Sequence, residues 1–166
     1  MTKLKYDFKN DTLFKMLFVK YPDLLKRLVA QLISISYESI EEFKINNSEM
    51  PPENLGDKFC RLDIHMTVNG QRVDLELQVA NEGDYPERAL YYWAREYSSA
   101  LDAGGEYRNL PRTIFVSIIA FTMFPCEEFY SHFELLEVNR HTKLTDKQVM
   151  YFFELPKISK EVNRDN

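Results

Sequence analysis

Two runs of alternating apolar and polar residues, separated by an Asn-Gly pair, constrain this chain more than any other feature. The apolar residues occupy every second position from Cys60 to Val68, and they do so again from Val73 to Val79. Such alternation is typical of half-buried β-strands. Asn69-Gly70 between the runs is the strongest short-range signal of a β-hairpin. We therefore predict two antiparallel strands joined by a tight turn.

The hairpin places two carboxylates on one face of the sheet. With a two-residue turn Asp63 pairs with Glu76, whereas a four-residue turn pairs His65 with Glu76 and still leaves both carboxylates on that face. Like charges at opposed positions destabilise a sheet, so a further group must offset them. One solution is a hard divalent cation bound by both carboxylates. The alternative is a solvated acidic face neutralised by Arg61 or Lys58.

Three further segments have the apolar spacing of helices. Asn10-Asp11 can cap the first, and Pro22 fits the first turn of the second. A third helix is capped by Asp84 and continues to about Ala103, where Gly104-Gly105 ends it. The apolar residues that we expect the second helix to bury are Leu24, Leu25, Leu28, Val29, Leu32 and Ile33.

The remaining strand-like segments complete a sheet. Residues 112–121 lack alternation, which is typical of a strand covered on both faces. A right-handed crossover through the third helix makes this strand parallel to the second hairpin strand. Shorter strand-like runs lie at residues 40–45, 132–138 and 149–155.

Length and composition are those of one globular domain. The chain has 166 residues, of which 45% are hydrophobic, with only 5 Gly and 7 Pro, which excludes a disordered or low-complexity segment. Cys60 and Cys126 form no C-x-x-C motif, so we exclude a disulfide framework and a cysteine-rich zinc site, and we expect buried thiols in preference to a catalytic one. The N-terminus lacks a signal peptide, and the longest apolar run, residues 114–124, is too short to cross a membrane. We expect a soluble, cytoplasmic protein without a membrane partner.

The charge distribution argues against broad coating of DNA. The net charge is −5, but residues 1–30 carry seven Lys and Arg against three Asp and Glu. A basic segment on an acidic chain permits local contact with phosphates.

Several segments of the chain match a known sequence pattern. Asp63, followed after the hairpin by Glu76-Leu77-Gln78, is similar to the D…(D/E)-x-K core of the PD-(D/E)-x-K nuclease superfamily, with Gln in the lysine position. The flanking sequence resembles the recombination-promoting nuclease, or transposase-like, branch, in which E-x-Q is common. The similarity extends in order along nearly the whole chain, through residues 11–15, 61–64, 87–93, 105–110, 144–146 and 154–157.

This resemblance implies an α/β fold with a restriction-endonuclease-like αβββαβ core, in which helices flank a mixed central sheet. We expect a single nuclease-like domain over residues 1–166, truncated at the C-terminus because members of the branch usually continue further. The implied activity is that of a Mg²⁺-dependent DNA endonuclease linked to recombination or transposition, with Mn²⁺ as a substitute metal. DNA is the implied partner, and a homodimer is compatible with the resemblance.

The resemblance also assigns roles to individual residues. Asp63 and Glu76 correspond to the metal ligands, helped by the carbonyl of Leu77. Gln78 occupies the position that elsewhere orients the attacking water.

Four accessory residues could contribute to the site or have ordinary structural roles. Asp11 could supply an outer acidic contact or only cap its helix, and Lys58 could supply the missing positive charge. Arg88 and Tyr92 share one helix face by their spacing, so they could hold a phosphate or form a solvated edge. We expect His65, beside the carboxylates, to be structural because Mg²⁺ prefers oxygen ligands.

Two other functions fit the same residues. An amide carries no charge and cannot replace the electrostatic stabilisation that lysine provides, so Gln78 also fits a DNA-binding or assembly module with little catalysis. A metal-free acid/base pair, as in glycoside hydrolysis, would need a cleft, and no aromatic cleft is evident in the sequence.

Overall fold

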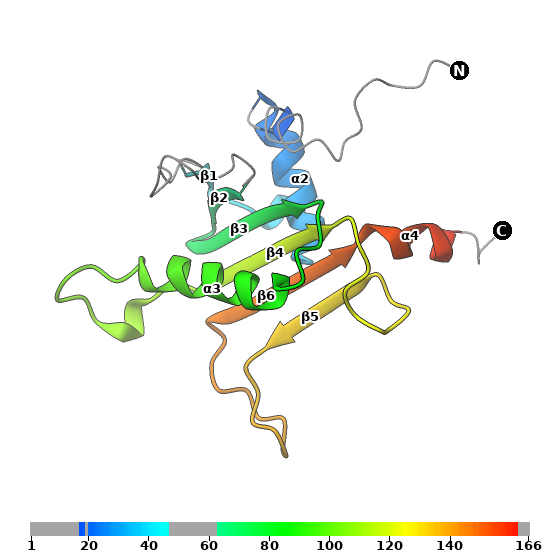
Figure 1. The fold of residues 1–166 in the computed structure, drawn as a ribbon. Helices are drawn as coiled ribbons and strands as arrows, with labels where there is room; N and C mark the ends of the chain where they lie inside the picture. The colour runs from blue at the N-terminus through cyan, green and yellow to red at the C-terminus, as the bar shows by residue number, and fades with distance from the viewer. Residues whose placement is uncertain (1–16, 19, 47–62, 163–166) are drawn as a thin grey trace, which may run out of the picture.

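The computed structural model describes residues 17–18, 20–46 and 63–162, with only the backbone given for residue 63 and residues 159–162. Within these ranges the chain forms a six-stranded mixed sheet in the order β1-β2-β3-β4-β6-β5, flanked by helices (Figure 1). The strands β3, β4 and β6 are parallel, and the remaining neighbours are antiparallel. The helices are α2 (Pro22–Leu32), α3 (Tyr85–Ser98) and α4 (Leu155–Val162), and the strands are β1 (Phe43–Ile45), β2 (Asp63–Val68), β3 (Gln71–Gln78), β4 (Thr113–Ile119), β5 (Tyr130–Glu134) and β6 (Gln148–Glu154).

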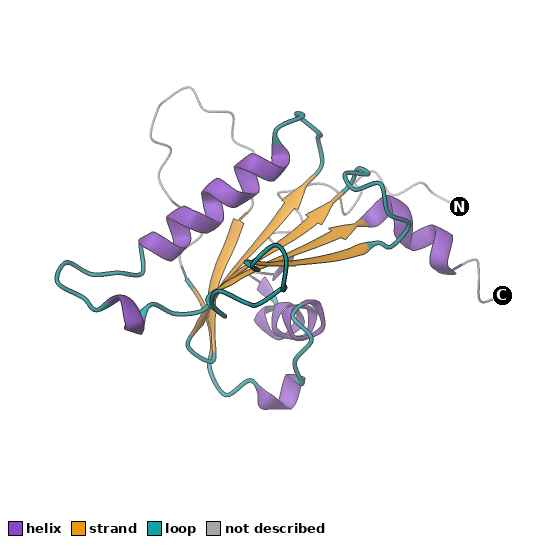
Figure 2. Ribbon diagram, turned by 90° about the horizontal axis from the view of Figure 1, so that it is seen from below, coloured by secondary structure: helices purple, strands orange, loops and turns teal. Residues whose placement is uncertain are grey.

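The sheet separates two apolar layers. Figure 2 shows α3 on one face of the sheet and α2 on the other. The α2-side cluster includes Leu25, Val29, Ile64, Leu75, Val116 and Tyr151. The α3-side cluster consists of the buried residues Tyr85, Ala89, Phe115, Ile119, Met150 and Phe152. This arrangement confirms the predicted α/β fold with helices flanking a mixed sheet.

The hairpin forms with the two-residue turn. Asn69 and Gly70 both have positive φ, at 48° and 73°, which a tight hairpin turn of this kind requires. The Asn69 side chain accepts hydrogen bonds from the backbone amides of Glu41 and Glu42, which ties the turn to the segment before β1. Val79, expected to be buried, is instead exposed because β3 ends at Gln78. Residues 60–62 of the first predicted strand lie outside the described residues.

The predicted helices form with two corrections. In α2, Pro22 lies in the first turn as expected, but Leu24 is 44% exposed because it lies away from the sheet-facing side of the helix. Helix α3 begins after Asp84 but ends at Ser98, earlier than predicted. There the carbonyl of Glu96 accepts hydrogen bonds from the Arg72 guanidinium and from a serine hydroxyl, and these bonds compete with continuation of the helix. The start of the first predicted helix, at Asn10-Asp11, is outside the described part of the chain, but Leu17, Phe18 and Lys20 near its end are helical.

The later strands form close to their predicted positions. All seven residues of β4 are buried, and the strand pairs in parallel with β3 as the crossover predicts. Strand β5 begins and ends earlier than the run predicted at residues 132–138. Cys126 is an exposed free thiol, so its predicted burial was wrong: it lies in the loop before β5. Among the described residues, no helix has the length and apolar character needed to span a membrane.

Candidate active site

The pairing of Asp63 with Glu76 is the centre of the candidate site. Strands β2 and β3 pair these two residues directly. In β2 the carbonyl of His65 accepts from the amide of Asn46 beside β1, and in β3 the amide of Arg72 bonds toward β4. The direction of the backbone N–H and C=O groups alternates from one residue to the next along a strand. Asp63 is two positions from His65 and Glu76 is four positions from Arg72, so the backbone groups of Asp63 point toward β1 and those of Glu76 point toward β4. Their pair is therefore of the non-hydrogen-bonded type, in which the Cα atoms are about 4.5 Å apart.

The polar face of β3 is buried beneath α3. Asp74, Glu76 and Gln78 alternate with apolar residues that face the α2-side cluster, yet all three are buried. This excludes the solvated acidic face that the sequence left open for the β3 side of the hairpin. Burying a carboxylate is costly unless it is paired or hydrogen-bonded, so the partners of these groups matter.

The Glu76 carboxylate, whose residue is only 2% exposed, has two partners supplied by α3. The Tyr85 hydroxyl donates to its Oε2 atom at 2.8 Å, and Arg88 Nη2 lies 3.5 Å from its Oε1 atom. Burial, together with the nearby charge of Glu76, raises the pKa of Tyr85 far above its usual value. The phenol therefore stays protonated and remains a hydrogen-bond donor to the carboxylate.

Of the four accessory residues predicted from the sequence, Arg88 lies in contact with Glu76. Its Nη1 atom lies 2.9 Å from Glu82 Oε2, so its guanidinium bridges two carboxylates. Tyr92 packs against the α3-side cluster. Asp11 and Lys58 lie outside the described residues.

Gln78 lies at the end of β3, two positions beyond Glu76. Its Nε2 group donates to the carbonyl of Ala80 at 2.7 Å, and its backbone carbonyl accepts from Ala120 on the β4 side. The carbonyl of Leu77, one residue earlier, must then point toward the β2 side, where Asp63 lies. The backbone is thus compatible with Leu77 as a third oxygen donor.

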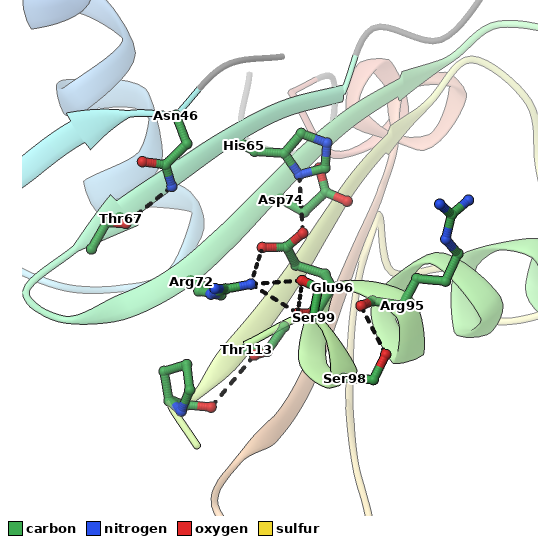
Figure 3. Close-up of polar contacts among 11 residues, drawn as sticks. Asn46, His65, Thr67, Arg72, Asp74, Arg95, Glu96, Ser98, Ser99 and Thr113 are labelled. Carbon is green, nitrogen blue, oxygen red and sulfur yellow. Dashed lines mark hydrogen bonds and ion pairs between the residues drawn. The ribbon is translucent and has the colours of Figure 1, made fainter. Parts of the chain in front are cut away.

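A second polar cluster lies next along the hairpin and connects it to α3 (Figure 3). His65 Nδ1 is 3.4 Å from Asp74 Oδ1 and 3.6 Å from Glu96 Oε2. Arg72 Nη1 approaches Glu96 Oε1 at 3.1 Å and also donates to the hydroxyl of Ser99 at 2.8 Å. These contacts fit the expected structural role of His65.

The donor atoms at the site suit a hard cation. Mg²⁺ and Mn²⁺ prefer oxygen ligands. Oxygen atoms are supplied by the Glu76 carboxylate and the Leu77 carbonyl, and aspartate at position 63 is a residue of the same donor type. Among the described side chains, no group of three or more His, Cys, Asp and Glu is arranged to hold a metal ion. The Asp63 carboxylate is not one of those described side chains.

Sequence reasoning missed Tyr85 and Ser117, which belong to the surroundings of Glu76. Tyr85 is the first residue of α3, directly before Pro86, and its hydroxyl lies 2.5 Å from Ser117 Oγ. The available signal was weak: Ser117 interrupts the apolar run of β4, and a buried serine in such a strand needs a partner.

Comparison with known proteins gives one match. Residues 8–166 match the family described as PD-(D/E)XK nuclease family transposase. The matched range includes every described residue of the candidate site. No curated protein and no solved structure matches the chain.

Proposed function

Because this chain belongs to the PD-(D/E)XK nuclease family transposases, we propose that it is a metal-dependent DNA endonuclease acting in recombination or transposition. Family membership by itself supports a nuclease or transposase-related role. The observation that carries the finer proposal is the direct pairing of Asp63 with Glu76 at a non-hydrogen-bonded position of the hairpin. Two acidic residues paired this closely repel each other, and a shared cation offsets that repulsion.

In this proposal Asp63, Glu76 and the carbonyl of Leu77 hold Mg²⁺, with Mn²⁺ as a substitute. When bound, such a cation polarises a phosphate and lowers the pKa of a water molecule. The role of the chain is to fix the ligands before the metal arrives. The hydrogen bond from Tyr85 and the charge of Arg88 restrict the Glu76 carboxylate in this way.

Gln78 is proposed to position the attacking water without acting as a base. Its Nε2 group donates to the Ala80 carbonyl, and its amide oxygen, the acceptor of this side chain, can accept a hydrogen bond from water. An amide does not titrate in the working pH range and cannot take the proton of the water. The proton must pass to solvent or to a phosphate oxygen.

Arg88 is proposed to bind a phosphate of the DNA. The Glu82 side chain that Arg88 contacts is 64% exposed, so an incoming phosphate can displace its carboxylate. A guanidinium offers the fork of donors that suits a phosphate. Arg88 would then link the substrate to the residue that holds the metal.

We expect Gln78→Ala to lower the rate of DNA cleavage about 100-fold and to leave metal affinity nearly unchanged. The reason is that a misplaced nucleophile costs about this factor, while the oxygen ligands stay in place. Cleavage rates at saturating metal and calorimetric titration with Mn²⁺ provide the two measurements. Loss of metal binding in this variant would instead make Gln78 a direct ligand.

The test of the proposed function is cleavage of supercoiled plasmid by the native protein with Mg²⁺ or Mn²⁺, compared with the same reaction in chelator. We expect nicked or linear product only when the metal is present. The alternative is a nuclease-fold DNA-binding or assembly module, favoured by the uncharged amide of Gln78. Retained DNA binding without cleavage under any metal condition would support that alternative.

A further inference from the structure

We propose that Tyr85 is a positioning residue that, together with Ser117, fixes the Glu76 carboxylate in the orientation that binds a divalent cation. This inference rests on the proposed function, in which Glu76 is a metal ligand. It adds two residues, from α3 and β4, to a site that the family motif restricts to β2 and β3.

Three buried polar groups meet at one level of the sheet. Ser117 is the residue of β4 that pairs with Glu76 of β3, and Tyr85 at the start of α3 reaches down to both. Tyr85 is 1% exposed and Ser117 is fully buried. Because water does not reach the hydroxyls of Tyr85 and Ser117, their hydrogen bonds must be made within the protein.

The hydrogen bonds among the three groups can run in only one direction. A carboxylate only accepts, so the single hydroxyl proton of Tyr85 is donated to Glu76 Oε2. Ser117 must then donate its own proton to the Tyr85 oxygen. The chain from Ser117 to Tyr85 to Glu76 therefore has a fixed polarity, and each bond strengthens the next. It gives Oε2 one fixed donor, while Arg88 Nη2 approaches Oε1 at 3.5 Å.

The Tyr85 ring is itself held in place by its neighbours. It makes edge-to-face contacts with Phe121 and Phe152, with ring centroids 5.9 and 6.4 Å apart. Phenylalanine would fill the same space in this apolar surrounding, so packing alone does not require the hydroxyl. The hydroxyl acts through Glu76, as groups that orient metal ligands commonly do.

The test is calorimetric titration of Mn²⁺ into the native protein, Tyr85→Phe and Ser117→Ala. We expect Tyr85→Phe to weaken metal binding by about 10- to 100-fold, the usual cost of removing an orienting group. Ser117→Ala should weaken it less, because the Tyr85 hydroxyl can still reach Glu76. The matched control is Tyr97→Phe on the same helix, whose ring stacks on Trp93 and whose variant should bind Mn²⁺ like the native protein.

Melting curves in chelator separate positioning from general stability. A native-like dissociation constant for both Tyr85→Phe and Ser117→Ala, whatever their melting temperatures, would overturn the inference while leaving the proposed function intact. A folded native protein that binds no Mn²⁺ would overturn the proposed metal site and this inference with it. Weakened binding in Tyr85→Phe with a melting temperature close to native supports the inference.

Discussion

Replacing Asp63 or Glu76 by alanine is expected to reduce metal-dependent DNA cleavage at least about 1000-fold. A metal ion contributes several kcal/mol to stabilising the transition state, and about 4 kcal/mol corresponds to this factor. Removing Glu76 also leaves the Tyr85 hydroxyl and Arg88 without the carboxylate that they contact, so the arrangement proposed to hold a metal is lost. The measurement is the rate of plasmid nicking at saturating Mg²⁺.

Asp102→Ala is the control for this prediction. Asp102 is exposed and lies beyond the end of α3, so its loss should leave the cleavage rate unchanged. Metal-dependent cleavage that survives both the Asp63 and Glu76 substitutions would place the active site elsewhere on the protein.

Lys157→Met is expected to lower the free energy of unfolding by about 3–5 kcal/mol, the usual cost of breaking a buried ion pair. Lys157 is 3% exposed and forms an ion pair with the fully buried Glu154 at the end of β6. Glu154 Oε1 accepts from the amides of Met123 and Phe124 at 2.6 and 3.2 Å, and Lys157 donates to the carbonyl of Phe124. The pair therefore ties the loop after β4 to the end of β6, and the variant leaves a buried carboxylate without its cation.

Urea unfolding of Lys157→Met and of Lys143→Met provides the measurement and its control. Lys143 pairs with Glu134 at 2.6 Å but is exposed, so its loss should cost less than about 1 kcal/mol. Equal effects of the two substitutions would contradict the structural role assigned to the buried pair.

This stabilisation should also depend on pH in one direction. Burial tends to lower the pKa of Lys157, but the hydrogen bond and charge of Glu154 outweigh it and raise the pKa above its usual 10.5. A raised pKa in the folded state means that the contribution is complete below the unfolded value and declines as pH rises through the folded value. The advantage of the native protein over Lys157→Met should therefore shrink only above about pH 10.5.

The hairpin and the face shared by its two carboxylates could be predicted from short-range rules. Asn69-Gly70 indicates a tight turn, and the alternating apolar residues forbid a shift by one position. The turn length, and with it the choice between Asp63 and His65 as the partner of Glu76, stayed open, and the structure selects the two-residue turn with Asp63 opposite Glu76. The parallel pairing of β4 with β3 was predictable for a similar reason, the fixed handedness of crossover connections.

The residues that the sequence did not reveal owe their roles to partners far along the chain. The end of α3 depends on Arg72, which lies in β3, and no pattern within the helix indicates that contact. Tyr85 and Ser117 are 32 positions apart and meet only when α3 packs on the sheet. The same holds for Glu154, whose amide partners lie in the loop after β4. Helical periodicity and strand alternation do not report such contacts.

The functional roles at the site came from the family resemblance combined with the hairpin. The register alone brings two acidic residues together, but it does not distinguish a metal site from a repulsive pair offset by Arg88. The roles of Asp63, Glu76, Leu77 and Gln78 therefore remain predictions that depend on metal binding.

Thermal melting of the native protein and of Asp63→Asn, each in Mg²⁺ and in chelator, tests this metal site most directly. A ligand that binds only the folded state stabilises it by mass action, so Mg²⁺ should raise the melting temperature of the native protein and have little effect on Asp63→Asn. In chelator, Asp63→Asn should be more stable than the native protein by about 0.5–1 kcal/mol, because a like-charge cross-strand pair is relieved. Asp102→Asn should behave like the native protein in both conditions. A native protein that melts at the same temperature with Mg²⁺ and with chelator, or an Asp63→Asn variant with the full native response to Mg²⁺, would contradict a metal held between Asp63 and Glu76.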